Sequence, residues 1–233
     1  MATIRGEGDV RCNRIIHFRS KEIGDKTHPT IPGYTNINAT SGNIRWKGLS
    51  PMKLGPFNLI EHRVTTPWYA DGLHPGFAAT EGGLQALSCT NLENIWQSSK
   101  VMNIDIDINK IIQPSFYQRR AKMAHDPKPH RRSIPKKQGY PICAYWDGYL
   151  LSYLDSRLVY CELYTSLVKE TYEYQELLAM KANGIIGFDG QDLPIDNESM
   201  MVACLDATKP FGHELVLCCL LKGIRPWRDI WLR

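Results

Sequence analysis

The chain has 233 residues, of which 43% are hydrophobic and 22% charged, so it carries enough apolar material for a packed core. Its longest dense apolar stretch, residues 215–221, is too short to span a bilayer, and its charged start predicts no secretory signal. The net charge of +4 is uneven, because residues 119–137 hold eight Lys or Arg and one acid, whereas the remainder is slightly acidic.

Residues 1–45 are rich in Gly, Pro, Asn and Thr, which predicts short strands and turns. Within them, residues 14–19 alternate in the manner of an early strand, with Ile16 and Phe18 on one face. Residues 69–83 contain several glycines and a proline, so they predict a long loop. Long loops in compact domains often carry function.

A capping box marks the start of the clearest helix in the N-terminal half. Thr90 and Glu93 stand three residues apart, as the motif requires. In this arrangement Thr90 caps the helix, and the Glu93 side chain bonds back to the Thr90 amide. The pattern predicts a helix over residues 91–102.

This predicted helix carries polar side chains on one face. Glu93, Gln97 and Lys100 recur at spacings of four and three residues, and Trp96 lies beside them. The face has two interpretations. It is either a functional site, or the sum of a capping glutamate, a surface glutamine and a lysine that favours the helix dipole.

Residues 103–109 alternate strictly between apolar and polar types, which is typical of a half-buried strand. Asp105 and Asp107 would then point to the same side. Two close carboxylates can bind a metal or divide acid and base roles. The simpler interpretation is the solvated face of a strand.

The basic segment, residues 119–137, cannot form one continuous helix because prolines stand at 127, 129 and 135. It has three interpretations: a contact for nucleic acid phosphates, a guide for an anionic small ligand, or a solvated loop. It lacks the interleaved aromatic residues of a stacking platform. His125 and His130 within it are expected to be exposed rather than metal ligands.

The C-terminal half predicts regular elements separated by turn signals. They are a helix over 156–182, a short strand over 185–188, a helix or strand over 199–205, and a helix over 212–222 that ends at Gly223. No conspicuous linker divides the chain. The predicted fold class is therefore α+β, in a single helix-rich domain covering residues 1–233.

The seven cysteines are odd in number, and no pair has Cys-x-x-Cys spacing. A disulfide framework or a zinc site is therefore not expected. Cys204, Cys218 and Cys219 lie among apolar residues, where a free cysteine behaves as a small buried hydrophobe. A reducing compartment follows, and the predicted location is the cytoplasm, without a membrane partner.

No signature of a common enzyme class is present, but residues 92–100 resemble the central motif of the NADAR family. That motif is approximately x-Glu-His-x-aromatic-Gln-x-x-Lys, and Asn94 stands here in place of its His. The family includes N-glycosidases that act on riboflavin-pathway intermediates, and hydrolases that remove ADP-ribose from modified guanine. Further pieces resemble the family in the same order, at 16–20, 49–52, 159–184 and 211–215.

The resemblance implies the NADAR fold, with inserted loops around 69–83 and 113–145. It also implies hydrolysis of an N-glycosidic bond in a nucleotide-type or ADP-ribosyl substrate, without a metal or an organic cofactor. The catalytic residues would be Glu93, next to the anomeric carbon, and Lys100, which would orient the sugar or attack it. The substrate-binding residues would be Arg19, Trp46, Ser50, Trp96, Gln97 and Glu214.

Two departures from the family pattern leave an alternative open. They are Asn94 in place of His, and Glu214 where the family has Asn before its last helix. The Trp-Gly pair usual before that helix is also absent. The alternative is a non-catalytic module that binds ADP-ribose or a related nucleotide.

Overall fold

The computed structural model describes residues 15–18, 34–37, 46–52, 54, 57–58, 88–109, 111–128, 130, 132, 141–146, 149–182, 185–189, 193–209 and 211–231. The predicted loop at 69–83 and the candidate Arg19 lie outside these residues. Within them the chain is α+β and rich in helix, as predicted, with three small sheets. None of the helices in this part combines the length and apolar character needed to cross a membrane.

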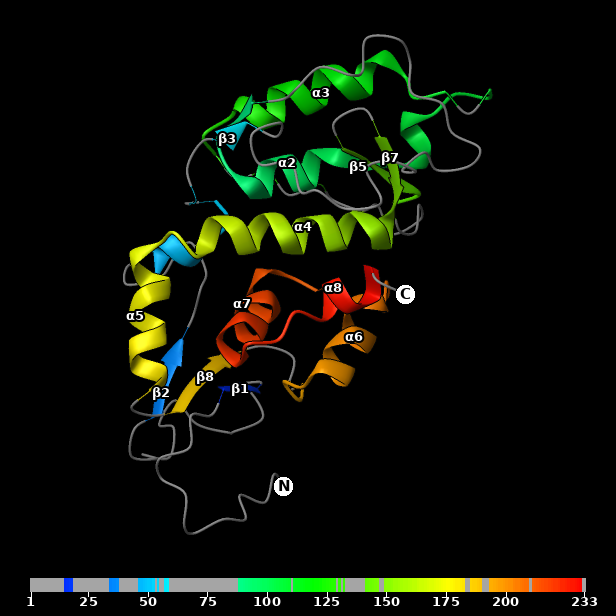
Figure 1. The fold of residues 1–233 in the computed structure, drawn as a ribbon. Coiled ribbons are helices and arrows are strands. Elements are labelled where there is room, and N and C mark those ends of the chain that lie inside the picture. Colours follow the sequence, from blue (N-terminus) through cyan, green and yellow to red (C-terminus); the bar gives the residue numbers. More distant parts are fainter. Residues whose placement is uncertain are drawn as a thin grey trace.

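Helix α4 (Tyr153–Val168) runs through the middle of the structure (Figure 1). Its first turn is capped by Ser152, whose hydroxyl accepts a hydrogen bond from the Asp155 amide at 3.0 Å. Strands β6 (Cys143–Trp146) and β7 (Tyr149–Ser152) and helix α2 (Leu92–Ser99) pack on one side of α4. Helices α6 (Asn197–Leu205), α7 (His213–Lys222) and α8 (Pro226–Trp231) pack on the other. Because α4 is covered on both sides, most of its residues are buried.

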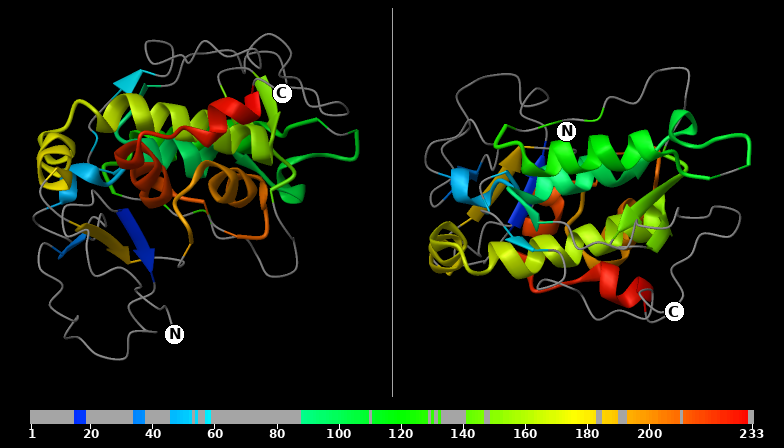
Figure 2. Two further views of the ribbon diagram at one scale, coloured as in Figure 1. Left: turned by 60° about the horizontal axis from the view of Figure 1, so that its bottom comes forward. Right: turned by 90° about the horizontal axis from the view of Figure 1, so that it is seen from above.

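The continuous helix predicted over 156–182 is wrong in one respect, because the structure breaks it in two. Helix α4 ends at Val168, and α5 (Tyr172–Lys181) begins after a short turn. Thr171 caps the second helix, since its hydroxyl accepts from the Tyr174 amide at 3.3 Å. The break lets α5 turn away from α4, as Figure 2 shows from two further directions.

The layer above α4 in Figure 1 contains two helices and two small antiparallel sheets. Its elements are β3 (Phe57–Asn58), β4 (Ser88–Cys89), α2 (Leu92–Ser99), β5 (Lys100–Val101), α3 (Pro114–His125), β6 (Cys143–Trp146) and β7 (Tyr149–Ser152). Strand β3 pairs with β4, and the other sheet has the order β5-β6-β7, in which Lys100 lies opposite Ala144.

The range 113–145, which was expected to hold an inserted loop, contains regular structure in its described part. Helix α3 occupies the first part of that range, and strand β6 reaches its end. Pro114 stands at the first helical position, where its missing N–H is not needed. The prolines that exclude a continuous helix come only after α3 has ended.

The strand predicted over 103–109 is also wrong. Residues Asn103–Asp105 form a short 3-10 helix, and Ile106 directly after it pairs with Ile112 across a turn at 108–109. Asp105 is buried, whereas Asp107 accepts hydrogen bonds from the amides of Asn109 and Ile111 within the turn. The two carboxylates serve different partners, and the described residues contain no cluster of three or more side chains that could hold a metal.

Helices α6, α7 and α8 and a parallel sheet lie below α4 in Figure 1, and α5 descends beside them. The elements of this lower layer are β1 (Ile15–Phe18), β2 (Tyr34–Ile37), β8 (Ile185–Asp189), α6 (Asn197–Leu205), α7 (His213–Lys222) and α8 (Pro226–Trp231). The sheet has the order β1-β8-β2 with both pairs parallel. The strands expected near 14–19 and 185–188 are thereby confirmed, and 199–205 is a helix.

Helix α7 ends at Gly223, as predicted. The residue has a φ of 80°, a left-handed conformation that side chains with a Cβ rarely adopt. Its amide donates to the carbonyls of Cys219 and Leu220. Three residues later, Pro226 begins α8 (Pro226–Trp231).

Two buried ionic side chains of α4 attach the lower helices. The guanidinium of Arg157 donates to the carbonyls of Cys204 and Asp206 at 3.0 Å and of Lys209 at 3.1 Å, where α6 ends. The carboxylate of Glu162 accepts from Trp227 Nε1 at 2.7 Å and from Arg228. These contacts satisfy helix-end carbonyls and a buried indole that would otherwise lack partners.

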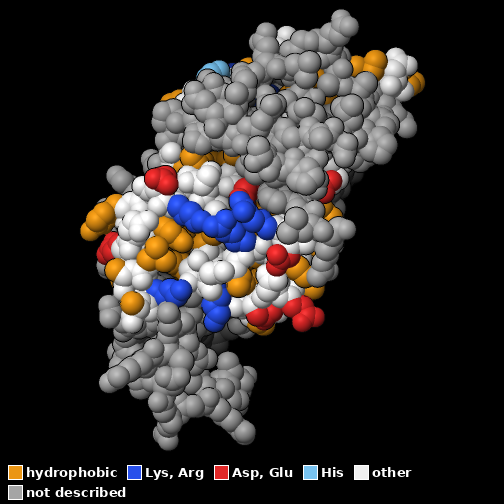
Figure 3. Space-filling view, viewed as in Figure 1, with side chains coloured by type: hydrophobic (Ala, Val, Ile, Leu, Met, Phe, Trp, Pro, Cys, Tyr) orange, Lys and Arg blue, Asp and Glu red, His pale blue; other side chains and the backbone are white. Residues whose placement is uncertain are grey.

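Lys169 interacts electrostatically with Glu162, Arg225 and Arg228, and its own ammonium and these two guanidinium groups are called here the basic seam. Figure 3 shows Lys and Arg side chains gathered between α4 and the segment that joins α7 to α8. Burial and the positive charge of Arg225 lower the pKa of Lys169, and Glu162 opposes them. Glu162 therefore neutralises only part of this seam.

The described cysteines behave as the apolar pattern predicts. Their thiols are free and buried at Cys89, Cys161, Cys204, Cys218 and Cys219. Burial raises the pKa of Cys89 to about 12, so its thiol stays protonated at neutral pH. Burial also raises the pKa of Cys161 well above its ordinary value. These cysteines are core residues rather than nucleophiles.

Candidate functional site

The first turn of α2 is capped by Asn91 and not by Thr90. Asn91 Oδ1 accepts from the Asn94 amide at 2.8 Å. The Thr90 hydroxyl instead donates to the carbonyls of Ala124 at 3.1 Å and Asp126 at 2.7 Å, at the end of α3. The predicted capping box is wrong, so Glu93 is not required for capping.

The three polar residues of α2 and β5 form a hydrogen-bonded row, called here the polar chain (Glu93, Gln97, Lys100). Gln97 Nε2 donates to Glu93 Oε1 at 2.7 Å, and Lys100 Nζ donates to Gln97 Oε1 at 2.9 Å. Gln97 and Lys100 are each only 7% exposed, and Glu93 is half-buried. The interpretation of Gln97 and Lys100 as solvated surface residues is therefore wrong.

Helix α2 ends at Ser99, earlier than predicted, and this matters for the polar chain. Lys100 is the first residue of β5, so its main chain is fixed by pairing with β6. Its side chain still reaches back to Gln97, one turn earlier. A sheet and a helix together hold the ammonium group in place.

Aromatic rings enclose one side of the polar chain. The ring of Trp96 lies 5.0 Å from that of Tyr160 and 6.0 Å from those of Tyr153 and Trp146, centroid to centroid. Lys100 Nζ sits 5.1 Å from the centroid of Trp96, a cation–π distance. Trp96 is thus a buried wall of the site, and Trp46 is likewise buried in the core.

Two stacked tyrosines of α4, Tyr160 and Tyr164, connect the polar chain to the candidates Ser50 and Glu214. Burial raises the pKa of Tyr160, and the negative charge of Glu93 raises it further, so the two groups interact. The Tyr160 ring stacks on Tyr164 at 6.4 Å. The Tyr164 hydroxyl donates to the Leu49 carbonyl at 2.6 Å, and the charge of Glu214 contributes to its raised pKa.

The structure therefore sorts the candidates into two groups. Glu93, Trp96, Gln97 and Lys100 lie together. Buried Ser50, next to Leu49, and half-buried Glu214 belong to the surroundings of Tyr164, at the far end of this tyrosine pair.

Two arginines that the sequence did not single out, Arg119 and Arg132, lie beside the polar chain together with Asp105. The Arg132 amide donates to Gln97 Oε1 at 3.3 Å, and its guanidinium contacts the Lys100 carbonyl and Asp105. Asp105 also accepts from Arg119 Nη2 at 2.8 Å. Burial lowers the pKa of Arg132, and the Asp105 carboxylate opposes this change. The sequence signals for this cluster were the concentration of positive charge in 119–137 and the carboxylate of Asp105, but neither indicated that the two would meet.

The basic segment is consequently not a solvated loop over its described part. Arg119 and Arg132 pair with Asp105, and Arg120 is 4% exposed with its guanidinium 5.0 Å from the ring of Tyr145. Lys122 and Lys128 are exposed. A nucleic acid partner for this segment stays a prediction.

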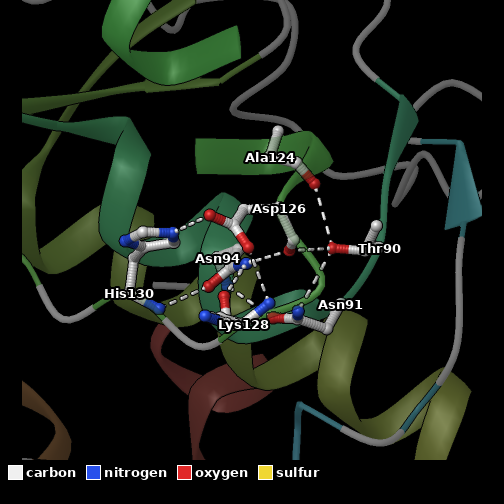
Figure 4. A network of polar contacts seen from close by, with 7 residues as sticks. All are labelled: Thr90, Asn91, Asn94, Ala124, Asp126, Lys128 and His130. Atoms are coloured by element: carbon white, nitrogen blue, oxygen red, sulfur yellow. Dashed lines mark hydrogen bonds and ion pairs between the residues drawn. The ribbon is translucent and has the colours of Figure 1, made fainter. Parts of the chain in front are cut away.

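Asn94, at the position of the family's His, has a structural task (Figure 4). It is fully buried, and its Nδ2 donates to the carbonyls of Asp126 at 2.8 Å and Lys128 at 2.9 Å. Its Oδ1 accepts from the His130 amide at 2.8 Å. The half-exposed His130 ring pairs with Asp126 at 2.7 Å, and hydrogen bonds from Lys128 and His130 hold the pKa of Asp126 below its usual range.

Replacing Asn94 by Ala should destabilise the fold by about 2–3 kcal/mol, because buried polar groups of the 126–130 segment lose their partners. Urea unfolding measures the effect, and faster amide exchange at His130 should locate it. Ser98→Ala is the matched control, since the buried Ser98 hydroxyl bonds only within its own helix, to Ile95. Equal effects of the two substitutions would contradict the assigned role of Asn94.

Comparison with known proteins yields no relative. No protein-family model matches the chain, and neither the curated proteins nor the solved structures contain a match. The chemistry of the site therefore has to follow from the side chains that form it. The resemblance of residues 92–100 to the NADAR motif stays a prediction from the sequence.

Proposed function

We propose that the chain is an N-glycosidase-like hydrolase that acts on a nucleotide-type or ADP-ribosyl substrate, with a NADAR-like fold. One observation carries the proposal: a carboxylate, an amide and an ammonium are joined in one nearly buried row. The spacing of Glu93, Trp96, Gln97 and Lys100 is that of the NADAR motif. The freedom of Glu93 from helix capping supports a chemical role for its carboxylate.

The proposed reaction requires the site to stabilise the charge that develops as the N-glycosidic bond breaks and to allow water to attack the anomeric carbon. When the N-glycosidic bond breaks, its electron pair stays on the base nitrogen, and positive charge develops on the anomeric carbon. The Glu93 carboxylate would stabilise this charge, or accept a proton from water as the water oxygen attacks that carbon. The proton released by water passes through solvent to the base nitrogen, so the products are a sugar with a new anomeric hydroxyl group and the neutral free base with an N–H. Neither a metal nor an organic cofactor takes part in this scheme.

Lys100 would orient the sugar. Its position near the face of Trp96 and its bond to the Gln97 carbonyl oxygen both favour the charged ammonium over the neutral amine. A charged ammonium donates hydrogen bonds to sugar hydroxyls but does not attack carbon. Gln97 would keep Glu93 and Lys100 at a fixed separation, which is the geometric part of catalysis.

Replacing Lys100 by Met should lower base release by about 100-fold or more, because a hydroxyl-orienting donor is lost while the side-chain volume is nearly kept. Chromatography of free base from a panel of nucleotides and ADP-ribosyl compounds measures the rate. Lys122→Met, which removes an exposed lysine of α3, is the control. Turnover that is unchanged in folded Lys100→Met protein would remove Lys100 from the mechanism.

The second candidate is a non-catalytic module that binds ADP-ribose or a related nucleotide. The observation in its favour is Asn94, whose side chain is hydrogen-bonded to the main chain of Asp126, Lys128 and His130 and carries no group that titrates near neutral pH. Calorimetry that shows tight binding of ADP-ribose, together with no turnover over hours, would favour this candidate over the hydrolase.

A further inference from the structure

We propose that Arg119 and Arg132 form a binding site for a phosphoryl group, such as that of a sugar phosphate or a pyrophosphate. The two guanidinium groups come from different segments and meet at one carboxylate. Asp105 Oδ1 accepts from Arg119, and Asp105 Oδ2 accepts from Arg132. This convergence is the basis of the site.

The charges of the cluster do not balance. Two cations face a single carboxylate, and no second acid among the described residues pairs with either arginine. Both carboxylate oxygens of Asp105 already accept hydrogen bonds, and Oδ2 also accepts from the Met102 amide at 2.8 Å. The Asp105 side chain is only 2% exposed. The excess charge of Arg119 contributes to the lowered pKa of Arg132. A bound anion would relieve this repulsion.

The donors suit a phosphoryl group. A guanidinium binds phosphate oxygens through two parallel N–H donors, and the bond strengthens when water is excluded. The Arg132 side chain is 10% exposed, whereas that of Arg119 is 35% exposed, so an anion can reach the site from solvent on the Arg119 side. Arg119 Nε is buried without an acceptor in the described part of the chain.

The cluster is joined to the polar chain by Arg132 itself. Its amide donates to Gln97 Oε1, and its guanidinium contacts the Lys100 carbonyl. A phosphoryl group at Arg119 and Arg132 would thus lie one arginine side chain away from Gln97. If the proposed function holds, this places the phosphate of the substrate at Arg119 and Arg132.

Calorimetry with inorganic pyrophosphate tests the site. The wild-type protein should bind pyrophosphate, and Arg119→Gln should weaken binding by about tenfold or more, the effect of losing a charge-assisted hydrogen bond. Lys122→Gln, which removes an exposed cation one turn along α3, should leave the affinity within about threefold. Adenosine, which has no phosphate, should show no dependence on Arg119.

Different results are expected if the phosphoryl-binding site is wrong and if the proposed hydrolase function is wrong. Lys100→Met should keep pyrophosphate affinity while losing turnover. Equal pyrophosphate affinity in wild-type and Arg119→Gln protein, or no binding by the wild type, would overturn the site and leave the hydrolase proposal standing. If Arg119→Gln unfolds, Arg119→Lys keeps a cation for Asp105 but lacks the planar fork, and it should still bind pyrophosphate more weakly.

Discussion

Replacing Arg157 by Met is expected to destabilise the protein by about 3–5 kcal/mol, a large share of the stability of an ordinary domain. The substitution removes the donors that satisfy three main-chain carbonyls at the end of α6, on Cys204, Asp206 and Lys209. A methionine fills much of the volume but cannot donate, so those buried acceptors lose their partners. The position of α6 against α4 should loosen as a result.

Urea unfolding followed by circular dichroism measures this effect as a shift of the midpoint. Lys209→Met is the matched control, because the Lys209 side chain is 65% exposed and its ammonium makes only a weak ion pair with Asp206, at 3.7 Å. Its removal should change stability by less than about 0.5 kcal/mol. A loss below about 1 kcal/mol for Arg157→Met would mean that water replaces the guanidinium at the end of α6.

Glu93→Gln should lower turnover by about 10²–10⁴-fold, the usual contribution of a general base or a charge-stabilising carboxylate. The substitution keeps the shape of the side chain, and the amide oxygen that replaces the carboxylate can still accept from Gln97 Nε2. Only the negative charge is removed, so the fold should persist. Rates of base release at equal folded fractions give the comparison.

A double-mutant cycle strengthens this test. If Glu93 and Lys100 act on the same transition state, the double variant with Glu93→Gln and Lys100→Met should lose much less than the product of the two single losses. Fully multiplicative losses would indicate independent roles. Normal turnover in Glu93→Gln would exclude the carboxylate from the chemistry.

The sequence correctly predicted those helices and strands whose ends are determined by residues within or directly beside the element itself. Gly223 ends α7 because its left-handed conformation is intrinsic to glycine. Strand β8 was visible from residues 185–188 alone, although its parallel partners β1 and β2 come from distant parts of the chain. These signals sufficed for the fold class but not for the sheet order.

Predictions failed where a distant partner competes with a local pattern. Thr90 had the spacing of a helix cap, but its hydroxyl bonds to the end of α3. Residues 103–109 had the alternation of a strand, yet Asp105 turns inward to the arginines at 119 and 132. No property of residues 103–109 reveals those partners.

The candidate site likewise contains residues that a local pattern predicted and residues whose position depends on distant partners. The common face of Glu93, Gln97 and Lys100 followed from their spacing, because one helical turn and a short extension bring them together. Arg132 could not be found by this route, since its place depends on the 126–130 segment that Asn94 holds. Charge concentration indicated the segment but not which of its residues turn inward.

Hydrolysis in water labelled with heavy oxygen tests the central claim most directly. With an N-glycoside substrate, wild-type protein should release the free base and a sugar that carries one labelled oxygen at its anomeric carbon, as mass spectrometry would detect. Folded Lys100→Met and Glu93→Gln proteins should form little of this product. Recovery of intact substrate from the wild type, at concentrations where calorimetry shows it bound, would contradict the hydrolase and leave a binding module.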